Sequence, residues 1–227
     1  MEQNNISNSS IETARFNMVQ QQIRPWSSSI PDDSILNLIS SIPREDFVAN
    51  QYRHLAFSDS EIPIGFGQTM MSPKMEARLL QVLNIKPHES VLEIGTGSGY
   101  LTALLANLAR HVVTVEIIPE LKEQAQAKLK SHGIVNVSCE SGDASQGWPQ
   151  NGSYDVIVVT GSIPTMQHDF RESLNTGGRL FVVVGDAPVM SAQLIRCTGK
   201  NQWTQESLFE TMLVPLSNIS QPDRFIF

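Results

Sequence analysis

The run EIGTGSG, from Glu93 to Gly99, has residue types and a spacing that suit ligand binding. It joins an apolar segment to a segment of helical length. Glycines at such a junction accept positive φ angles and let backbone N–H groups approach a ligand closely. The spacing is G-x-G-x-G, whereas dinucleotide sites have G-x-G-x-x-G. The glycines alone are a weak signal, because loops of this kind bind several nucleotide-like ligands, but the dinucleotide pattern is not met.

Three acidic residues make this signal more specific. Glu93 precedes the first glycine, Glu116 ends the next apolar run, and Asp143 follows the third. In open α/β sheets, ligands bind outside the carboxyl ends of the strands, where all three acids are expected. A single acid there is an ordinary strand end, but three at consecutive strand ends favour a nucleoside pocket, with Glu116 on the ribose hydroxyls and Asp143 at the base. The predicted cofactor contacts are Glu93, Gly95, Thr96, Gly97, Ser98, Gly99, Glu116, Ile117, Asp143 and Ala144.

The elements that would position these residues begin at Ser90. VLEI, VVTVEII, NVSCESGD, YDVIVVTG and GRLFVVVG are apolar runs without alternation, and segments of helical length separate them. This pattern is typical of parallel strands covered on both faces. The helix before the fifth run is predicted to end at Asn175. The link Gly185–Ser191 is too short for a helical crossover, so AQLIRCT and SLFETMLVPL are predicted to form an antiparallel hairpin, with GKNQW as a turn.

The first part of the chain predicts helices. Residues 1–10 are rich in Asn and Ser and are expected to be frayed. A helix is expected from Ile11 to about Ile23, broken at Arg24-Pro25-Trp26. Another should be capped by Asp32-Asp33 and bury Ile35, Leu36, Ile39 and Ile42, and a third should start at Pro73.

These elements predict an α/β fold. It has a Rossmann-like, doubly wound, mostly parallel sheet, a C-terminal antiparallel hairpin and an N-terminal helical extension. Residues 11–89, the helical and acceptor-loop region, and residues 90–227, the cofactor-binding core, are expected to form one compact domain.

Composition restricts the functional classes. The chain has 227 residues, 41% of them hydrophobic, and a net charge of −7, which disfavours nucleic acid binding. We expect no membrane partner, because no segment has transmembrane length and the N-terminus does not resemble a signal peptide, so the predicted location is cytoplasmic. Cys139 and Cys197 are expected to be buried, reduced thiols, and the scattered histidines predict no metal site.

The loop and its neighbours also carry a resemblance to a known family. VLEIGTGSGYLTALLA, the acid in VTVEI, GDASQGWP, YDVIVVTG, LNTGGRLFVVVG, SIPREDFV and AFSDSEIPIGFGQTMMSP resemble the protein-L-isoaspartate O-methyltransferase family, which has the class I methyltransferase fold. The resemblance extends from about Arg15 to Leu216. It implies that S-adenosylmethionine is the cofactor and S-adenosylhomocysteine the product.

The resemblance also assigns a role to IPIGFGQTMMSPK, Ile62–Lys74, which we interpret as an ordered loop without helical or strand periodicity. In the family the matching loop covers the methyl group and receives the substrate carboxylate, through a serine two residues before the proline. Here Met71 occupies that position, and Ser72 comes one residue later. Thr69, Met71 and Ser72 are the candidate catalytic residues. The loss of one hydrogen bond would slow the reaction without preventing it, because a carboxylate needs no general base.

Two further segments were considered for the acceptor site. Arg24 and Trp26 could clamp an acceptor, but we favour the simpler interpretation of a solvent-facing arginine and a tryptophan at the edge of the core. Gly161-Ser162-Ile163-Pro164 is expected to form a tight turn with backbone hydrogen bonds beside the acceptor.

The leading function is methyl-esterification of isoaspartyl residues in damaged proteins. A methyltransferase of the same fold that acts on an unidentified small acceptor remains an alternative because of Met71, as does a catalytically silent cofactor-binding module. The expected partner is an isoaspartyl protein or peptide, or the small acceptor, and the chain is expected to be a monomer or weak dimer.

Overall fold

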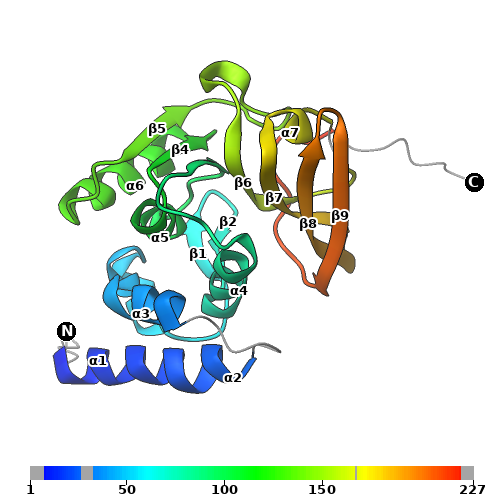
Figure 1. Cartoon of the computed structure of the whole chain (residues 1–227). Helices are drawn as coiled ribbons and strands as arrows, with labels where there is room; N and C mark the ends of the chain where they lie inside the picture. The colour runs from blue at the N-terminus through cyan, green and yellow to red at the C-terminus, as the bar shows by residue number, and fades with distance from the viewer. Residues whose placement is uncertain (1–7, 27–32, 167, 221–227) are drawn as a thin grey trace, which may run out of the picture. The chain divides into compact units, whose positions relative to one another are not determined.

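The computed structural model describes residues 8–26, 33–166 and 168–220 (Figure 1). The chain consists of two compact units, Met1–Gln81 and Val82–Phe227. The division falls inside helix α4 (Pro73–Leu83), a few residues before the boundary at residue 90 that the sequence predicts for the cofactor-binding core.

The first unit contains short helices and one β-hairpin. Its elements are α1 (Asn8–Asn17), the π-helix η1 (Met18–Ile23), α2 (Arg24–Trp26), α3 (Asp33–Ser41), the 3₁₀ helices η2 (Arg44–Asp46) and η3 (Asn50–Leu55), β1 (Ile62–Gly65), β2 (Gln68–Met70) and most of α4. The predicted core positions of α3 are buried, as is Ile42 just beyond its end. Helix α4 begins at Pro73, as predicted, because proline is well suited to the first helical position.

The predicted break at Arg24-Pro25-Trp26 is wrong. The helical path continues through Pro25 to Trp26, and the preceding turn is a π-helix in which the N–H of Arg24 bonds the carbonyl of Val19. Proline removes one backbone donor and crowds the carbonyl four residues earlier, and a widened turn accommodates both effects. Residues 8–10, which we expected to be frayed, form the start of α1. Residues 1–7 and the predicted capping residue Asp32 lie outside the described ranges.

The segment Ile62–Lys74 is also more regular than the sequence suggested. β1 and β2 pair antiparallel, with Ile62 opposite Met70. Gly65, Phe66 and Gly67 all have positive φ angles at the turn. The tight turn therefore explains why glycines flank Phe66. Because the turn separates two short strands, their alternation of side chains is not apparent in the sequence.

The second unit is an α/β unit built on a large sheet. Its elements are β3 (Ser90–Ile94), α5 (Tyr100–Leu108), β4 (His111–Glu116), α6 (Pro119–Ser131), β5 (Val137–Ser141), the 3₁₀ helix η4 (Pro149–Asn151), β6 (Tyr154–Ile163), α7 (His168–Glu172), β7 (Leu174–Asp186), β8 (Val189–Gly199) and β9 (Gln202–Glu210). Within the described ranges the sheet has seven strands in the order β5-β4-β3-β6-β7-β8-β9. Strands β3 to β7 pair parallel, and β8 and β9 continue antiparallel at one edge (Figure 1). The predicted mostly parallel sheet and antiparallel C-terminal strands are confirmed.

Different residues cover the two faces of the sheet. Helix α5 contacts β4, and α6 contacts β4 and β5. Because Glu93 of β3 bonds a side chain of α5, Glu93 and Thr114, which are paired in register, point toward that helical face. The opposite face carries the main apolar cluster, in which Leu92, Val113 and Ile157 pack with Phe170 of α7.

Two predicted boundaries near the end of the chain are wrong. The helix before β7 ends at Glu172, and Asn175 already belongs to β7, because the start of β6 holds this segment: the N–H of Tyr154 donates to Ser173, and the Asn175 amide donates to Asp155. The final strand β9 covers Gln202–Glu210 and does not include MLVPL. That segment instead bridges to β6, through Pro215 beside Ser162.

Candidate cofactor site at the carboxyl ends of the parallel strands

The loop Gly95–Gly99 lies between β3 and α5, and its backbone needs glycine at alternate positions. Gly95, Gly97 and Gly99 have φ angles of 94°, 53° and 84°. A Cβ on Gly95 would lie 2.2 Å from Oγ1 of Thr160, and one on Gly99 would lie 3.0 Å from Cβ of Ala125. The three glycines therefore let the loop turn tightly against β6 and α6.

Glu93 supports this loop from beneath. Its side chain is fully buried, and Oε2 accepts hydrogen bonds from the hydroxyls of Thr102, at 2.5 Å, and Thr114, at 2.7 Å. The Thr114 hydroxyl also lies 2.7 Å from that of Thr96 in the loop. Glu93 thus holds hydroxyls inside the unit. The sequence signal for these partners was the presence of threonines within the apolar runs VVTVE and YLTALLA.

Glu116 lies at the carboxyl end of β4 and is tied to the loop. One of its carboxylate oxygens accepts the N–H of Gly97 at 2.9 Å, and the other accepts the N–H of Ile118 at 3.1 Å. A carboxylate oxygen has two lone pairs, so each can accept a further hydrogen bond from a ligand. The two backbone donors fix the direction in which those lone pairs point.

Asp143 lies beside Glu116, because the N–H of Gly142 donates to the Glu116 carbonyl at the end of β5. The N–H of Ser145 bonds one oxygen of Asp143 at 2.9 Å, and the amide of Asn218 bonds the other at 3.0 Å. These hydrogen bonds hold the pKa of Asp143 below its usual range, so it is a carboxylate at neutral pH. Asn218 is 75 residues away in sequence, and no local signal indicated it.

The end of β6 completes this edge of the sheet. The hydroxyl of Thr160 donates to the carbonyls of Ile94 and Gly95, both at 2.8 Å. Ser162 exchanges backbone hydrogen bonds with the C-terminal segment, through the carbonyl of Val214 and the N–H of Leu216. The predicted turn at Gly161–Pro164 is therefore wrong for its first three residues, which belong to β6, although their backbone hydrogen bonding is confirmed. A Cβ on Gly161 would lie 2.9 Å from the Leu216 nitrogen, which explains the glycine.

The structure thus gathers Glu116, Asp143 and the glycine loop at the carboxyl ends of β3, β4 and β5. Of the other predicted contacts, Thr96 and Ser98 are buried within the loop, Ile117 is half-buried, and Ala144 belongs to the apolar cluster. What remains for a ligand is a backbone turn with two oriented carboxylates. This donor and acceptor set fits the hydroxyls and amine of a nucleoside.

The predicted acceptor residues lie in the first unit, around the joint between β2 and α4. Met71 is buried, with 7% of its surface exposed, whereas Ser72 is half-buried. The Ser72 hydroxyl accepts the N–H of Met75 and so caps α4. The hydroxyl of Thr69 donates to Glu61 at 2.8 Å. Met71 and Ser72 therefore differ in exposure, as a one-residue shift predicts.

Arg24 and Trp26 make contacts within the first unit. The Arg24 guanidinium donates to Gln20 and to Asp33, both at 2.9 Å. The Trp26 ring lies near Lys74 and Arg78, whose charged groups are 5.8 and 5.1 Å from its centre. These contacts account for both residues without an acceptor.

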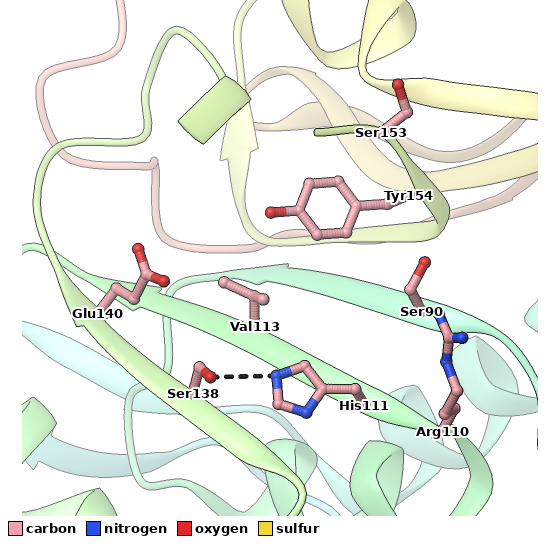
Figure 2. A pocket seen from close by; sticks show the side chains of 8 residues that line it. All are labelled: Ser90, Arg110, His111, Val113, Ser138, Glu140, Ser153 and Tyr154. Carbon is pink, nitrogen blue, oxygen red and sulfur yellow. Dashed lines mark hydrogen bonds between the residues drawn. The ribbon is translucent and has the colours of Figure 1, made fainter. Parts of the chain in front are cut away.

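A hollow of about 630 Å³ opens at the opposite ends of the strands. Ser90, His111 and Tyr154, which line it, are the first residues of β3, β4 and β6 (Figure 2). Several of its polar groups have protein partners: Nε2 of His111 lies 3.1 Å from the Ser138 hydroxyl, and Glu140 accepts the indole N–H of Trp148. Although burial acts in the opposite direction, hydrogen bonds from Ser90 and Asn175 and the charge of Arg110 keep the pKa of Asp155 low. Because it opens at the opposite ends of the strands, the hollow is separate from the glycine loop.

Other site types receive no support. Cys139 and Cys197 are free, on strands at opposite sides of the sheet, and burial followed by the charge of Glu93 raises the pKa of Cys139. Cys197 is buried as predicted, whereas Cys139 is only half-buried. In the part of the chain that the structure describes, we find no cluster of metal-ligating side chains. No helix in the described ranges is long and apolar enough to cross a membrane.

Comparison with known proteins identifies the family. Residues 17–221 match the family model for protein-L-isoaspartate(D-aspartate) O-methyltransferase. The chain belongs to this family. It is 39% identical over 209 residues to the protein-L-isoaspartate O-methyltransferase of Serratia proteamaculans, covering 92% of this chain and 96% of that one. It is 38% identical over 204 residues to the enzyme of the same name from Yersinia enterocolitica, covering 89% and 95%.

Solved structures show the same methyltransferase fold. A protein-L-isoaspartate O-methyltransferase superposes with a TM-score of 0.76 at 24% identity, covering 90% of this chain and 65% of that one. A Plasmodium falciparum protein assigned to this activity, in complex with S-adenosyl-L-homocysteine, gives a TM-score of 0.72 at 22% identity, covering 91% and 97%. These likenesses establish the fold, and the sequence matches establish the family.

Proposed function

We propose that this protein transfers the methyl group of S-adenosylmethionine to the carboxylate of isoaspartyl residues in damaged proteins. The observation that carries the proposal is the intact carboxyl edge of the sheet in a chain that matches the family over residues 17–221. The Glu116 carboxylate is fixed by the Gly97 and Ile118 N–H groups at this edge.

Four groups would hold the cofactor. Glu116 would accept hydrogen bonds from the ribose hydroxyls, and Asp143 would lie at the adenine end of the site. The loop Gly95–Gly99 supplies the close backbone approach, and Glu93 keeps that loop in place through Thr102 and Thr114. When bound, S-adenosylmethionine supplies an electrophilic methyl group, and the carbon–sulfur electron pair stays on sulfur in the thioether product.

The acceptor needs little activation. A free α-carboxyl group has a pKa of about 3.3–3.7, so at neutral pH it is an anionic nucleophile that needs no general base. Its oxygen forms the new bond to the methyl carbon as the carbon–sulfur bond breaks, which gives a neutral methyl ester. The main task of the protein is then alignment, which can contribute about 7–11 kcal/mol to lowering a barrier.

We assign the acceptor carboxylate to the segment Thr69–Ser72. Ser72 is the hydroxyl nearest in sequence to the family's serine position, and a hydroxyl that accepts one hydrogen bond can still donate its own proton. Met71 is buried and contributes shape to the segment without polar contact. Two free cysteines support a reducing compartment, and we therefore place the reaction in the cytoplasm.

A methyl-transfer assay tests this function. The protein is incubated with labelled S-adenosylmethionine and an isoaspartyl peptide, beside a peptide of the same sequence with a normal aspartyl residue. We expect base-labile methyl ester on the isoaspartyl peptide alone. Equal labelling of both peptides, or labelling of neither while S-adenosylhomocysteine still raises the melting temperature, would contradict the proposed acceptor.

A further inference from the structure

Hydrogen bonds hold the backbone at the joint between β2 and α4, and one of them comes from a residue outside the joint. Met71 and Ser72 connect Met70, the last residue of β2, to Pro73, the first of α4. The Ser72 carbonyl accepts the N–H of Glu76, and the Ser72 hydroxyl accepts that of Met75. The carbonyl of Met71 accepts instead from Nη2 of Arg44, at 2.5 Å.

Arg44 is completely buried in the first unit, which is unusual for an arginine. It starts the short helix η2, and its side chain has no exposed surface. Besides the Met71 carbonyl, it bonds the carboxylate of Glu76 in the first turn of α4 through Nη1. A planar guanidinium can bond two acceptors in a fixed relative orientation, which a lysine ammonium on a flexible stem does not reproduce.

The two bonds have a joint consequence for residues 71 and 72. Because the guanidinium plane is rigid, it fixes the Met71 carbonyl relative to the start of α4. The peptide group between Met71 and Ser72 includes that carbonyl, so its orientation sets the direction in which the Ser72 hydroxyl leaves the backbone. The side chain of Met71 itself is buried.

We propose that Arg44 is a positioning residue for methyl transfer, which orients the Met71–Ser72 peptide through its bonds to Met71 and Glu76. This inference rests on the proposed function and adds to it a residue that acts through the acceptor segment. A misplacement of about 1 Å in a reacting group can reduce a rate by about 100-fold, so the orientation of one peptide group is a sufficient cause.

A neighbouring ion pair provides the matched control. Arg15 of α1 bonds Glu45, the residue after Arg44, at 2.5 Å, and both are largely buried. This pair belongs to the same unit, and Glu45 lies in the same short helix η2 as Arg44. In the described part of the chain, the bond of this pair does not involve the joint. Arg15→Lys and Arg44→Lys therefore make the same chemical change, and only the second alters the bond to Met71.

The test compares kcat for isoaspartyl peptide in the wild type, Arg44→Lys and Arg15→Lys. Rates are divided by the number of sites that bind S-adenosylhomocysteine, so that unfolded protein does not count. We expect kcat to fall by about 10- to 100-fold in Arg44→Lys, with KM for S-adenosylmethionine unchanged, and by less than about threefold in Arg15→Lys. Equal losses in the two variants would show a merely structural role and overturn the inference.

Hydrogen exchange separates this inference from the proposed function. The amide of Ser72 belongs to the peptide group that Arg44 orients, and its exchange is measured without a substrate. We expect faster exchange there in Arg44→Lys than in Arg15→Lys. If the wild type methylates no isoaspartyl peptide but this difference is present, the function fails and the positioning stands for the true acceptor. If exchange is equal in both variants, the positioning is wrong whatever the activity.

Discussion

A buried glutamate holds each of the two segments that we propose bind the cofactor and the acceptor, but the two glutamates have different partners. Glu93 lies under the glycine loop of the second unit and accepts from the hydroxyls of Thr102 and Thr114. Glu76 lies beside the acceptor segment of the first unit and bonds the guanidinium of Arg44. Neutral donors can be removed one at a time, whereas an ion pair loses its only compensation when one partner is removed. The acceptor segment is therefore expected to be the more sensitive of the two.

The largest effect is expected from breaking the ion pair. Arg44→Met leaves the Glu76 carboxylate and the Met71 carbonyl without the guanidinium inside the first unit. Removal of one partner of a buried pair reduces the free energy of unfolding by about 3–5 kcal/mol. Denaturant unfolding above pH 7, where the Glu76 carboxyl is ionised in the folded state, measures the change. A loss below about 1 kcal/mol would mean that the Arg44–Glu76 ion pair stabilises the fold no more than the threonine hydroxyls bonded to Glu93.

The pH dependence of stability sharpens the same comparison. Burial, opposed by the charge and hydrogen bond of Arg44, raises the pKa of Glu76 from 4.5 to about 7. Between pH 4.5 and about 7 the folded state therefore binds more protons than the unfolded state. The contribution of Glu76 to the free energy of unfolding is fully present below pH 4.5 and is lost as pH rises to about 7. At about 1.4 kcal/mol per unit, the contribution is on the order of 3 kcal/mol.

Glu76→Gln provides the control for this prediction. It removes the titrating group and keeps an oxygen that can accept from Arg44. The difference in unfolding free energy between wild type and Glu76→Gln should change across pH 5–7. A difference independent of pH would show that Glu76 titrates in its ordinary range.

Cofactor binding should depend strongly on Glu116. Glu116→Ala removes the carboxylate that we propose accepts both ribose hydroxyls, and it also removes the partner of the Gly97 N–H. Hydrogen bonds to charged groups contribute about 1.5–3 kcal/mol each, so the loss of two of them should raise the Kd for S-adenosylhomocysteine by at least about 100-fold. Isothermal titration measures it, with Glu120→Ala, an exposed acid at the start of α6, as the control. Unchanged affinity would remove Glu116 from the cofactor site.

Met71→Ser restores the residue that the family pattern has at this position. If only a hydrogen bond to the acceptor carboxylate is missing, kcat/KM for isoaspartyl peptide should rise by about one to two orders of magnitude, equivalent to 1.5–3 kcal/mol. Met70→Ser, one residue earlier and equally buried, is the control. No change with Met71→Ser would show that the chain has moved to another way of holding the acceptor.

The smallest effect is expected from removing one of the two hydroxyls that donate to Glu93. Thr102→Val keeps the shape of the side chain and removes one of the donors to Glu93, while Thr114 remains. The free energy of unfolding should fall by about 1–2 kcal/mol, less than in Arg44→Met. Asn107→Ala, on the same helix α5, is the control. If Thr102→Val reduced the free energy of unfolding as much as Arg44→Met, the two buried glutamates would not differ in how strongly their partners hold them.

The sequence by itself determined features that depend on neighbouring residues. Apolar runs without alternation predicted the parallel strands, and Pro73 and Pro119 marked the starts of α4 and α6. Glu116 and Asp143 were predicted to lie close together because strand ends can be located from these runs, and parallel strands bring their carboxyl ends to one edge. Such features follow from local backbone preference and hydrophobic period, both of which can be read within one segment.

Only the tertiary structure decided what depends on residues far apart in the chain. The path of the helix through Pro25, the turn of the hairpin at Phe66 and the early start of β7 all overrode local signals. Arg44 reaches Met71 and Glu76 across 27 and 32 residues, and Asn218 reaches Asp143 across 75. The sequence names these residues but not their distances, because packing of the whole chain sets which polar groups must be paired once water is excluded.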